Sequence, residues 1–106
     1  YVQKMSDEIL ENIPSIFSLS QNYPNPFNPV TKLDYNLPLR SMVNISIYNV
    51  LGQEVKTIIN REQEYGYHSI TWDGIDNRGK QMSSGVYFAR MNSDSFSQTK
   101  KMLLVK

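Results

Sequence analysis

The sequence predicts an all-β protein, an antiparallel β-sandwich of immunoglobulin type with about seven strands. Three observations carry this prediction. Apolar and polar residues alternate in several short runs, which is the pattern of strands with one buried and one solvated face. Turn-forming residues separate these runs at short intervals. The chain has 106 residues, which is the length of one domain.

The predicted strands follow one another from residue 32 to the end of the chain. Apolar residues occupy every second position over 32–37, 43–47 and 68–72. The runs 86–91 and 101–105 are rich in apolar residues and complete the set. The turn signals between the runs are Leu37-Pro38, Leu51-Gly52, Tyr65-Gly66, Asp73-Gly74, Asn77-Arg78-Gly79 and Ser84-Gly85.

Residues 1–16 differ from the rest and are predicted to form a connector that leads out of an upstream domain. Apolar residues recur at every fourth position from Met5 until Pro14 ends the pattern, which indicates two to three turns of helix. The sequence begins without Met and without a signal peptide, so we expect it to be the C-terminal piece of a longer protein. The alternative interpretation is an ordered helix packed on the domain. The β-sandwich itself is expected to span residues 17–106.

The charge balance and composition argue against several classes of protein. The chain carries 11 Lys and Arg against 10 Asp and Glu, a net charge of +1. Nucleic-acid-binding domains usually have a strongly basic face, so no nucleic-acid partner is expected. No apolar run approaches the roughly 20 residues that span a bilayer, so no direct membrane insertion is expected. Because there is no Cys, the chain has no disulfide, thiol nucleophile or zinc–cysteine site.

Few residues have the chemistry of a catalytic site. His68, the single histidine, is in phase with Ile70 and Trp72 on the predicted core face, so we interpret it as a hydrogen-bonded packing residue. Asp73 and Asp76 lie in a predicted turn, where Asp side chains usually cap backbone amides. A hydrolytic triad needs a base beside a nucleophile, and glycoside hydrolysis needs two converging acids. We therefore predict no enzymatic activity and no cofactor.

Asp73, Asp76 and Asn77 are weak candidates for a calcium site. Their oxygens fall at the first, fourth and fifth positions of the turn, whereas the helix–loop–helix calcium loop uses the first, third and fifth. Arg78 adds a positive charge beside them. We interpret this stretch as a hairpin turn and predict no metal.

The 12 aromatic residues suggest a second class of function, an accessory module of an extracellular enzyme that binds polysaccharide or acts as a spacer. Tyr48 is out of phase with the apolar residues of its run, and Tyr65 and Tyr67 flank a glycine, so these rings are candidates for exposure. Trp72 is interpreted instead as the core anchor of the sandwich.

The most unusual segment is 23–29, in which three of the five prolines lie within six residues. Each proline removes a backbone donor and pushes the preceding residue towards an extended conformation. The segment is therefore predicted to be a stiff rim, with the Asn25 and Asn28 side chains bonded to backbone groups and Phe27 turned inward as a plug. Two interpretations remain open: a cap that prevents edge-to-edge sheet pairing, or a rigid recognition surface.

Four sequence motifs, in order, cover the predicted domain. The opening motif occupies residues 19–29, the middle motif 47–55, a third motif 66–74, and the closing motif 84–88 together with 99–106. Together they resemble the C-terminal sorting domain of the type IX secretion system (type A, Por secretion family). The immunoglobulin-like domain of flagellar hook-capping proteins is related and shares the middle and closing motifs. The proline-rich opening and the Lys-rich terminal strand favour the sorting domain.

The resemblance implies a non-catalytic secretion and sorting signal for the upstream cargo. Proteins with this tail cross the inner membrane with an ordinary signal peptide, and the outer-membrane secretion translocon then recognises the tail. A sortase-like peptidase commonly removes it. The cargo is secreted or attached to the outer cell surface of a Gram-negative bacterium.

The recognition residues that the resemblance implies are those that match its motifs. Val50 and Gln53 occupy positions where the family often has Asp and a basic residue, so the middle motif departs from the family pattern. The matching residues are Pro24, Asn25, Pro26, Phe27, Asn28 and Pro29 in the opening motif, Gly52 in the middle motif, and Gly85, Tyr87, Lys100, Lys101 and Val105 in the closing motif.

The last part of the chain is locally basic. Residues 78–106 contain six basic side chains and one acid, Asp94. Such a run is either a solvated face or a docking patch for an acidic translocon surface. Tyr87 is in phase with the predicted core, whereas Phe88 and Arg90 face the other way. Proteolytic processing is expected in the polar stretch 5–18.

Overall fold

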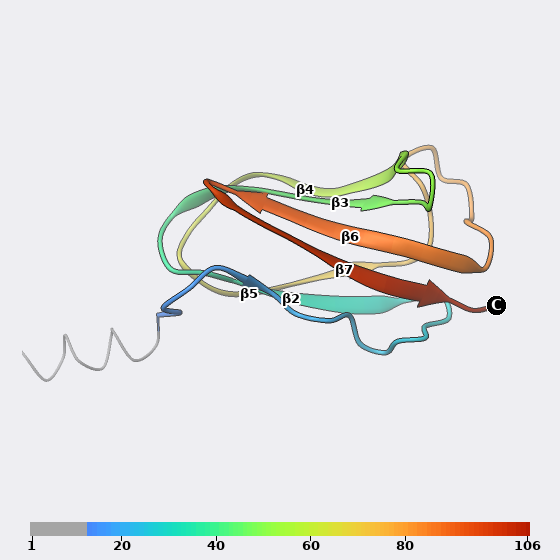
Figure 1. The fold of residues 1–106 in the computed structure, drawn as a ribbon, viewed down its shortest axis with the longest axis horizontal. Helices are drawn as coiled ribbons and strands as arrows, with labels where there is room; N and C mark the ends of the chain where they lie inside the picture. The colour runs from blue at the N-terminus through green and yellow to red at the C-terminus, as the bar shows by residue number, and fades with distance from the viewer. Residues whose placement is uncertain (1–12) are drawn as a thin grey trace, which may run out of the picture.

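The computed structural model describes residues 13–106, and over these residues the chain folds as two antiparallel β-sheets (Figure 1). The predicted all-β sandwich of immunoglobulin type is therefore confirmed. The expected connector helix falls almost entirely on residues outside the described range. The strands are β1 (Ser18–Leu19), β2 (Thr31–Leu37), β3 (Ser41–Tyr48), β4 (Glu54–Gln63), β5 (Gly66–Trp72), β6 (Gly85–Ser93) and β7 (Phe96–Leu104).

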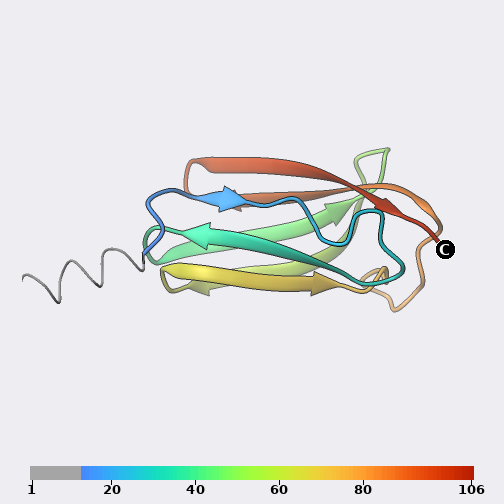
Figure 2. The same cartoon turned by 90° about the horizontal axis from the view of Figure 1, so that it is seen from below.

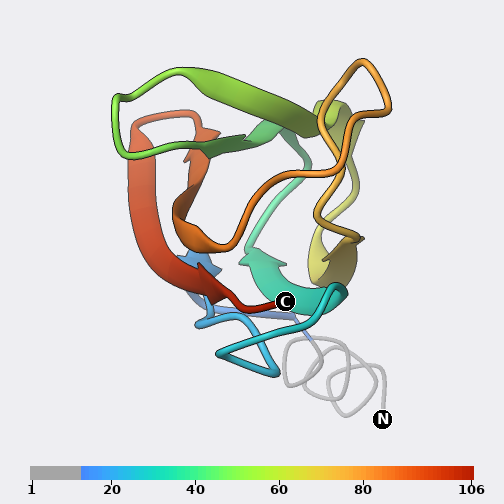
Figure 3. The same ribbon diagram turned by 90° about the vertical axis from the view of Figure 1, so that its right-hand side faces the viewer.

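The two sheets lie face to face, as Figures 2 and 3 show from two further directions. One sheet has the order β1-β2-β5 and the other the order β4-β3-β6-β7. β7 is therefore an edge strand, and a tight turn joins it to β6, with Ser93 paired to Phe96. Asp94 in this turn has φ 52°, a conformation that Asp tolerates better than most residues. Among residues 13–106, no helix has the length and apolar character needed to cross a membrane.

The inward side chains of both sheets form one core. Leu33, Tyr35 and Leu37 are buried at alternate positions of β2, as the period-two pattern predicts. On β6, Tyr87, Ala89 and Met91 are buried in the same way. The remaining buried apolar residues are Leu19, Phe27, Val43, Ile45, Ile47, Val55, Trp72, Met102 and Leu104.

His68 and Trp72 have the packing roles that their phase predicts. Trp72 is buried in the core, and its Nε1 donates to the carbonyl oxygen of Ile75 at 3.0 Å. His68 is half-buried and stacks on Tyr35, with ring centroids 5.1 Å apart. Its Nε2 lies 2.8 Å from the carbonyl oxygen of Glu64. The hydrogen-bonded packing role predicted for His68 is confirmed.

β4 is the long strand that the alternation pattern does not reveal. The register of β3 against β4 shifts twice, so that Ile58 and Val55 are extra residues on β4. Each bulge reverses the phase of inward and outward side chains, and this breaks the period of two.

Candidate functional site

The opening and closing motifs, which are predicted recognition segments, lie side by side in the structure. The Phe27 amide donates to the Leu103 carbonyl at 3.0 Å, and the Val105 amide donates to the Phe27 carbonyl at 2.9 Å. Phe27 thereby forms a parallel bridge with Leu104. The Leu103 amide donates to Oδ1 of Asn25 at 3.0 Å. The proline-rich segment therefore covers the outer edge of the last part of β7 (Figure 1).

The hydrogen bonds between the proline-rich segment and the end of β7 form a seam. A further contact extends this seam towards the start of the opening motif. The Gln21 side-chain amide donates to the Lys101 carbonyl at 2.7 Å. At the other end of the chain, the Lys106 amide donates to Oγ of Ser84 at 3.0 Å. The last residues of the chain are thus held from two sides.

Phe27 is the inward plug that the sequence predicts. Only 2% of its surface is exposed, and its ring centroid lies 5.8 Å from that of Trp72. Trp72 in turn makes an edge contact with Tyr87 at 5.3 Å. The Tyr87 hydroxyl donates to the Ser83 carbonyl at 2.7 Å. Phe27 and Tyr87 are motif residues that shape the surface from beneath.

A buried polar pair, which the sequence analysis did not single out, fixes the ends of the proline-rich segment. Nδ2 of Asn22 donates to Oγ1 of Thr31 at 2.9 Å and to the Pro24 carbonyl at 3.1 Å. Oγ1 of Thr31 donates to the same carbonyl at 2.8 Å. Both side chains are almost fully buried. The burial of Thr31 could have been predicted from the sequence, because Thr31 is in phase with the buried residues of β2.

The rest of the proline-rich segment faces solvent. Pro24, Asn25, Pro26 and Pro29 are exposed, and Tyr23 is the most exposed ring near them, at 78%. Asn25 bonds a backbone group as predicted. Asn28 does not: within residues 13–106 its side chain makes no hydrogen bond, so that part of the prediction is wrong. Pro29 and the exposed Val30 lead directly into β2, and the exposed Asn28 lines a hollow together with Asp73 and Lys106.

The middle motif forms the turn between β3 and β4. Oδ1 of Asn49 accepts from the amides of Leu51 and Gln53, each at 3.0 Å, and Gly52 has φ 79°, which favours glycine. The turn exposes two apolar side chains, Val50 and Leu51, at 68% and 78%. The tip of this turn is therefore an apolar part of the surface.

The neighbouring Lys100 and Lys101 of the closing motif lie on opposite faces of β7. Lys101 is exposed on the outer face of the sheet, directly across from Phe88. Lys100 is half-buried and lies across from Ala89, in the phase that points between the sheets. Gly85 begins β6 opposite Leu104, and Val105 is exposed beside the proline-rich seam.

The weak metal candidates belong to a self-capped turn. Oδ1 of Asp73 accepts from the Ile75 amide, and Oδ1 of Asp76 accepts from the Arg78 and Lys80 amides at 2.9 and 2.8 Å. The Lys80 amide is the main cause that lowers the pKa of Asp76 below its ordinary value. The predicted capping roles are confirmed. Over residues 13–106, no three His, Cys, Asp or Glu side chains converge.

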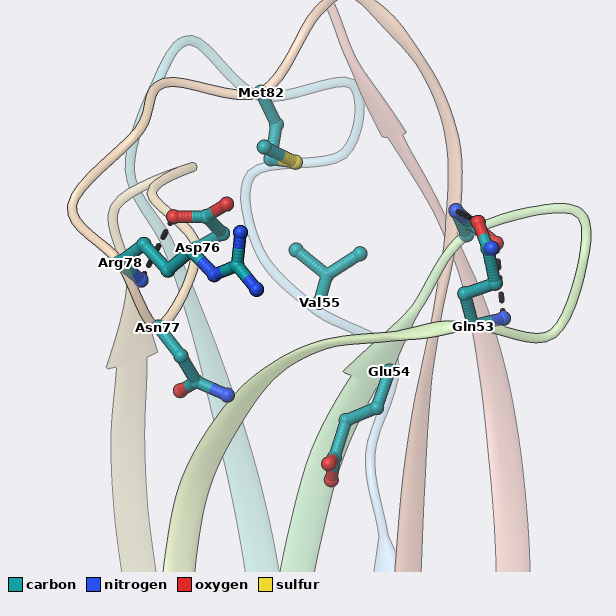
Figure 4. Close-up of a pocket in the computed structure, with 8 residues that line it drawn as sticks. Gln53, Glu54, Val55, Asp76, Asn77, Arg78 and Met82 are labelled. Atoms are coloured by element: carbon teal, nitrogen blue, oxygen red, sulfur yellow. Dashed lines mark hydrogen bonds between the residues drawn. The ribbon is translucent and has the colours of Figure 1, made fainter.

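Beside this turn lies a polar hollow of about 550 Å³, shown in Figure 4. Asn77 lies on the turn, and its Oδ1 accepts from the Thr57 amide at 3.1 Å. Arg78 lies beside Asp76 and points towards Val55, and Met82 lies above Val55 in this view. Acidic, basic and apolar side chains line the hollow together. The hydrogen bond between Asn77 and Thr57 holds the turn to β4.

The exposed aromatic candidates do not gather on one face. Tyr65 and Tyr67 are exposed at the connection between β4 and β5, and Tyr67 lies opposite Asn36 of β2. Tyr48 is only half-buried and lies at the opposite end of its sheet, next to the β3–β4 turn. The three rings therefore form no shared platform.

Comparison with known proteins agrees with this architecture. The crystal structure of dimeric latent PorU from Porphyromonas gingivalis is similar over 88% of this chain and 10% of that chain, with 20% identity and a TM-score of 0.62. PorZ, described as an essential surface component of the type IX secretion system of the same organism, is similar over 85% of this chain and 11% of its own, with 18% identity and a TM-score of 0.54. At these identities the likeness shows the fold, and the chain spans about a tenth of each protein.

FlgD from P. aeruginosa is similar over 70% of this chain and 58% of its own, with 30% identity and a TM-score of 0.52. A comparison with curated proteins found no match. The sequence model of the FlgD Ig-like domain matches residues 30–96, which is more than half of the chain. The hook-capping relative noted from the motifs is thus the family that the match establishes. This chain belongs to the FlgD Ig-like domain family.

Proposed function

We propose that this chain is a non-catalytic C-terminal sorting signal that directs an upstream cargo through the outer-membrane translocon of a type IX secretion system. In this proposal residues 1–16 connect the cargo to the signal and residues 17–106 form the signal. The cargo passes through the periplasm and is then secreted or attached to the outer surface of a Gram-negative cell.

The observation that carries the proposal is the seam between the two segments outside the family match. The match covers residues 30–96, and the opening segment 21–27 is hydrogen-bonded to the terminal segment 101–105. Both segments contain motifs that resemble the sorting domain. Their contacts fix an exposed surface in one shape, and a rigid surface loses little conformational entropy when a partner binds.

The fold neighbours support the same pathway. PorZ is described as a surface component of the type IX secretion system, and PorU and PorZ share the fold of this chain over most of its length. The partners that we propose are the secretion translocon and a sortase-like peptidase that removes the signal.

The absence of catalysis in the proposal is supported by the roles of the candidate residues. His68 stacks on Tyr35, and Asp73 and Asp76 cap their own turn. Each of these side chains therefore has a structural role, in packing or in capping backbone amides.

A reporter fusion tests the proposal. A folded reporter with a periplasmic signal peptide is fused ahead of the 106-residue chain and expressed in a type IX-competent cell. We expect the reporter outside the cell, and we expect removal of 100–106 to leave it in the periplasm. That deletion also removes the buried Met102 and Leu104 and so can unfold the domain. A second variant, Lys101→Glu with Leu103→Asp, therefore changes only exposed side chains of the terminal strand. We expect this variant to fold and to leave the reporter in the periplasm. A wild-type fusion that folds but stays in the periplasm, or a folded double variant that is exported as well as wild type, contradicts the proposal.

Processing has a separate test. Phe17 stacks on Phe96 with ring centroids 5.6 Å apart, and Pro14 is buried, so the described part of the stretch 5–18 is packed at these two residues. We expect mass spectrometry of secreted cargo to place the mature C-terminus within or just ahead of this stretch. An intact tail on mature surface cargo contradicts removal by a peptidase.

The exposed Tyr65 and Tyr67 support a second candidate, a polysaccharide-binding or spacer module of an extracellular enzyme. Depletion of the purified chain onto insoluble glycans, lost in a Tyr65→Ala, Tyr67→Ala variant, is the result expected for that module. The sorting proposal predicts no depletion.

A further inference from the structure

A row of large side chains crosses the outer face of the four-stranded sheet beside the β3–β4 turn. Tyr48 pairs with Phe88 across β3 and β6, and Phe88 pairs with Lys101 across β6 and β7. Both rings are half-buried, although this face of the sheet is turned away from the core. Aromatic rings in such a position supply large contact area to a partner at low entropic cost.

Next to this row is a hollow of about 290 Å³ between the turn and the sheet. Its apolar lining comes from Tyr48, Val50 and Phe88, and its polar lining includes Arg90 and Thr99. Exposed Leu51 and Leu103 continue the apolar surface on either side. An apolar patch of this kind with a polar rim is typical of a protein-binding surface.

The charged side chains of this face are mostly positive. Within residues 13–106 the ion pairs join Lys32 to Asp34 and Arg40 to two glutamates, so neither Arg90 nor Lys101 takes part in one. The acid nearest in register is Glu54, which lies across from Tyr48 and accepts from the Thr57 hydroxyl. The two cations are thus available to carboxylates of a partner.

We propose that this surface, defined by Tyr48, Val50, Phe88, Arg90 and Lys101, binds an acidic protein segment. An apolar side chain of the segment enters the hollow against the two rings, and flanking carboxylates pair with the two cations. The identity of the partner as part of the secretion machinery rests on the proposed function, whereas the binding chemistry rests on this surface alone. Charge complementarity steers the encounter, and the buried apolar contact sets the lifetime of the complex.

A peptide titration tests this inference on the full 106-residue chain. Two short peptides are compared, one that alternates leucine with glutamate and one that alternates leucine with lysine. Binding is followed by the amide chemical shifts of Val50, Phe88 and Thr99. We expect saturable shifts with the glutamate peptide, an affinity that falls with added salt, and no saturation with the lysine peptide.

Surface variants sharpen the test. Arg90→Glu combined with Lys101→Glu is expected to weaken binding by at least about tenfold, as for close charge pairs at an interface. Val50→Asp places a negative charge at the turn tip and is expected to weaken binding as well, without a change in the sheet. The matched control is Lys32→Glu on the other sheet, which should change the affinity by less than about twofold.

Three results overturn the inference: equal binding of both peptides, shifts centred on Tyr65 and Tyr67, or the same shifts produced by protein concentration alone, which would indicate self-association. The titration needs no secretion machinery, so its outcome is independent of the export assay. Peptide binding without export contradicts the sorting proposal alone, and export without peptide binding contradicts this docking inference alone.

Discussion

Segments 21–29 and 73–80 lie at the same end of the sandwich, and both are rich in Asn, Asp and turn-forming residues, but their side chains bind at different distances along the chain (Figure 3). Asp76 accepts from amides two and four positions away. Asn25 and Gln21 bind backbone groups 78 and 80 positions away. The turn is therefore capped largely by its own amides, with one further tie from Asn77 to β4. The proline-rich segment is held by the nearby Asn22–Thr31 pair and also by distant contacts with β7.

Two neighbouring segments of one surface thus differ in what stabilises them: mainly local hydrogen bonds in 73–80, and tertiary contacts in 21–29. Loss of a cap in 73–80 should loosen one turn. Loss of a contact in 21–29 should release the end of the terminal strand and, with it, the surface proposed for recognition.

The largest effect is expected at the plug. Phe27→Ala removes a buried ring beside Trp72 and should lower the free energy of unfolding by about 3–5 kcal/mol. Urea unfolding followed by tryptophan fluorescence measures this change. The matched control is Tyr23→Ala in the same segment, whose exposed ring should matter by less than about 0.5 kcal/mol. Similar losses for both variants would contradict the assignment of Phe27 as the plug.

A smaller effect is expected for the buried polar pair. Asn22→Ala leaves the Thr31 hydroxyl with one partner fewer and removes a bond to the Pro24 carbonyl, and should cost about 1–3 kcal/mol. Equilibrium unfolding measures the loss. Asn28→Ala, four residues after Pro24 on the exposed rim, is the control and should leave stability within about 0.5 kcal/mol. Equal stability of Asn22→Ala and the wild type would show that the pair does not hold the segment.

The seam itself should respond more locally. Asn25→Ala removes the acceptor of the Leu103 amide and should cost about 1 kcal/mol. Hydrogen exchange should accelerate at Leu103 more than at Ala89, which lies inside the sheet. Uniform acceleration along β6 and β7 would show that Asn25 stabilises the whole domain and not the seam.

The features that the sequence predicts are those set by local contacts, and the features it does not predict depend on contacts between distant parts of the chain. The alternation of Leu33, Tyr35 and Leu37 and the turn chemistry of Asp73 and Asp76 are local signals, and they correctly predicted the fold class, the buried positions of the alternating strands and the self-capped turn. Phe27, which lies between the prolines of a segment predicted to be stiff, was correctly predicted to be an inward plug.

Non-local features were beyond sequence reasoning. The bulges at Val55 and Ile58 remove the periodicity of β4, so that strand could not be predicted from alternation. Asn25 and Asn28 have the same chemistry in sequence, and only the position of β7 decides that one bonds Leu103 while the other stays in solvent.

The smallest effect concerns the turn and depends on pH. Backbone amides that donate to the Asp76 carboxylate lower its pKa below the ordinary value of 3.8. A lowered pKa in the folded state adds stability above the unfolded pKa, and that stability is lost as pH falls through the folded pKa. Asp76→Asn should therefore be less stable than wild type at neutral pH, with a gap that narrows in acid.

Urea midpoints measured from neutral pH to below about 3.8 check this expectation. Asp94→Asn, in the β6–β7 turn at the other end of the sandwich, controls for the general loss of a carboxylate. A gap between Asp76→Asn and wild type that stays constant through the acid range would contradict the capping role of the charged form.

The seam can be tested most directly at the penultimate residue. Val105 lies one residue from the end of the chain, where amides usually exchange freely. Because its amide donates to the Phe27 carbonyl, we expect its hydrogen exchange to be slowed to the range of the β6 amides, and to become fast in Phe27→Ala. Exchange of Val105 at the rate of an unstructured peptide in the wild-type chain would contradict the joining of the proline-rich segment to the terminal strand, and with it the surface on which the proposed function depends.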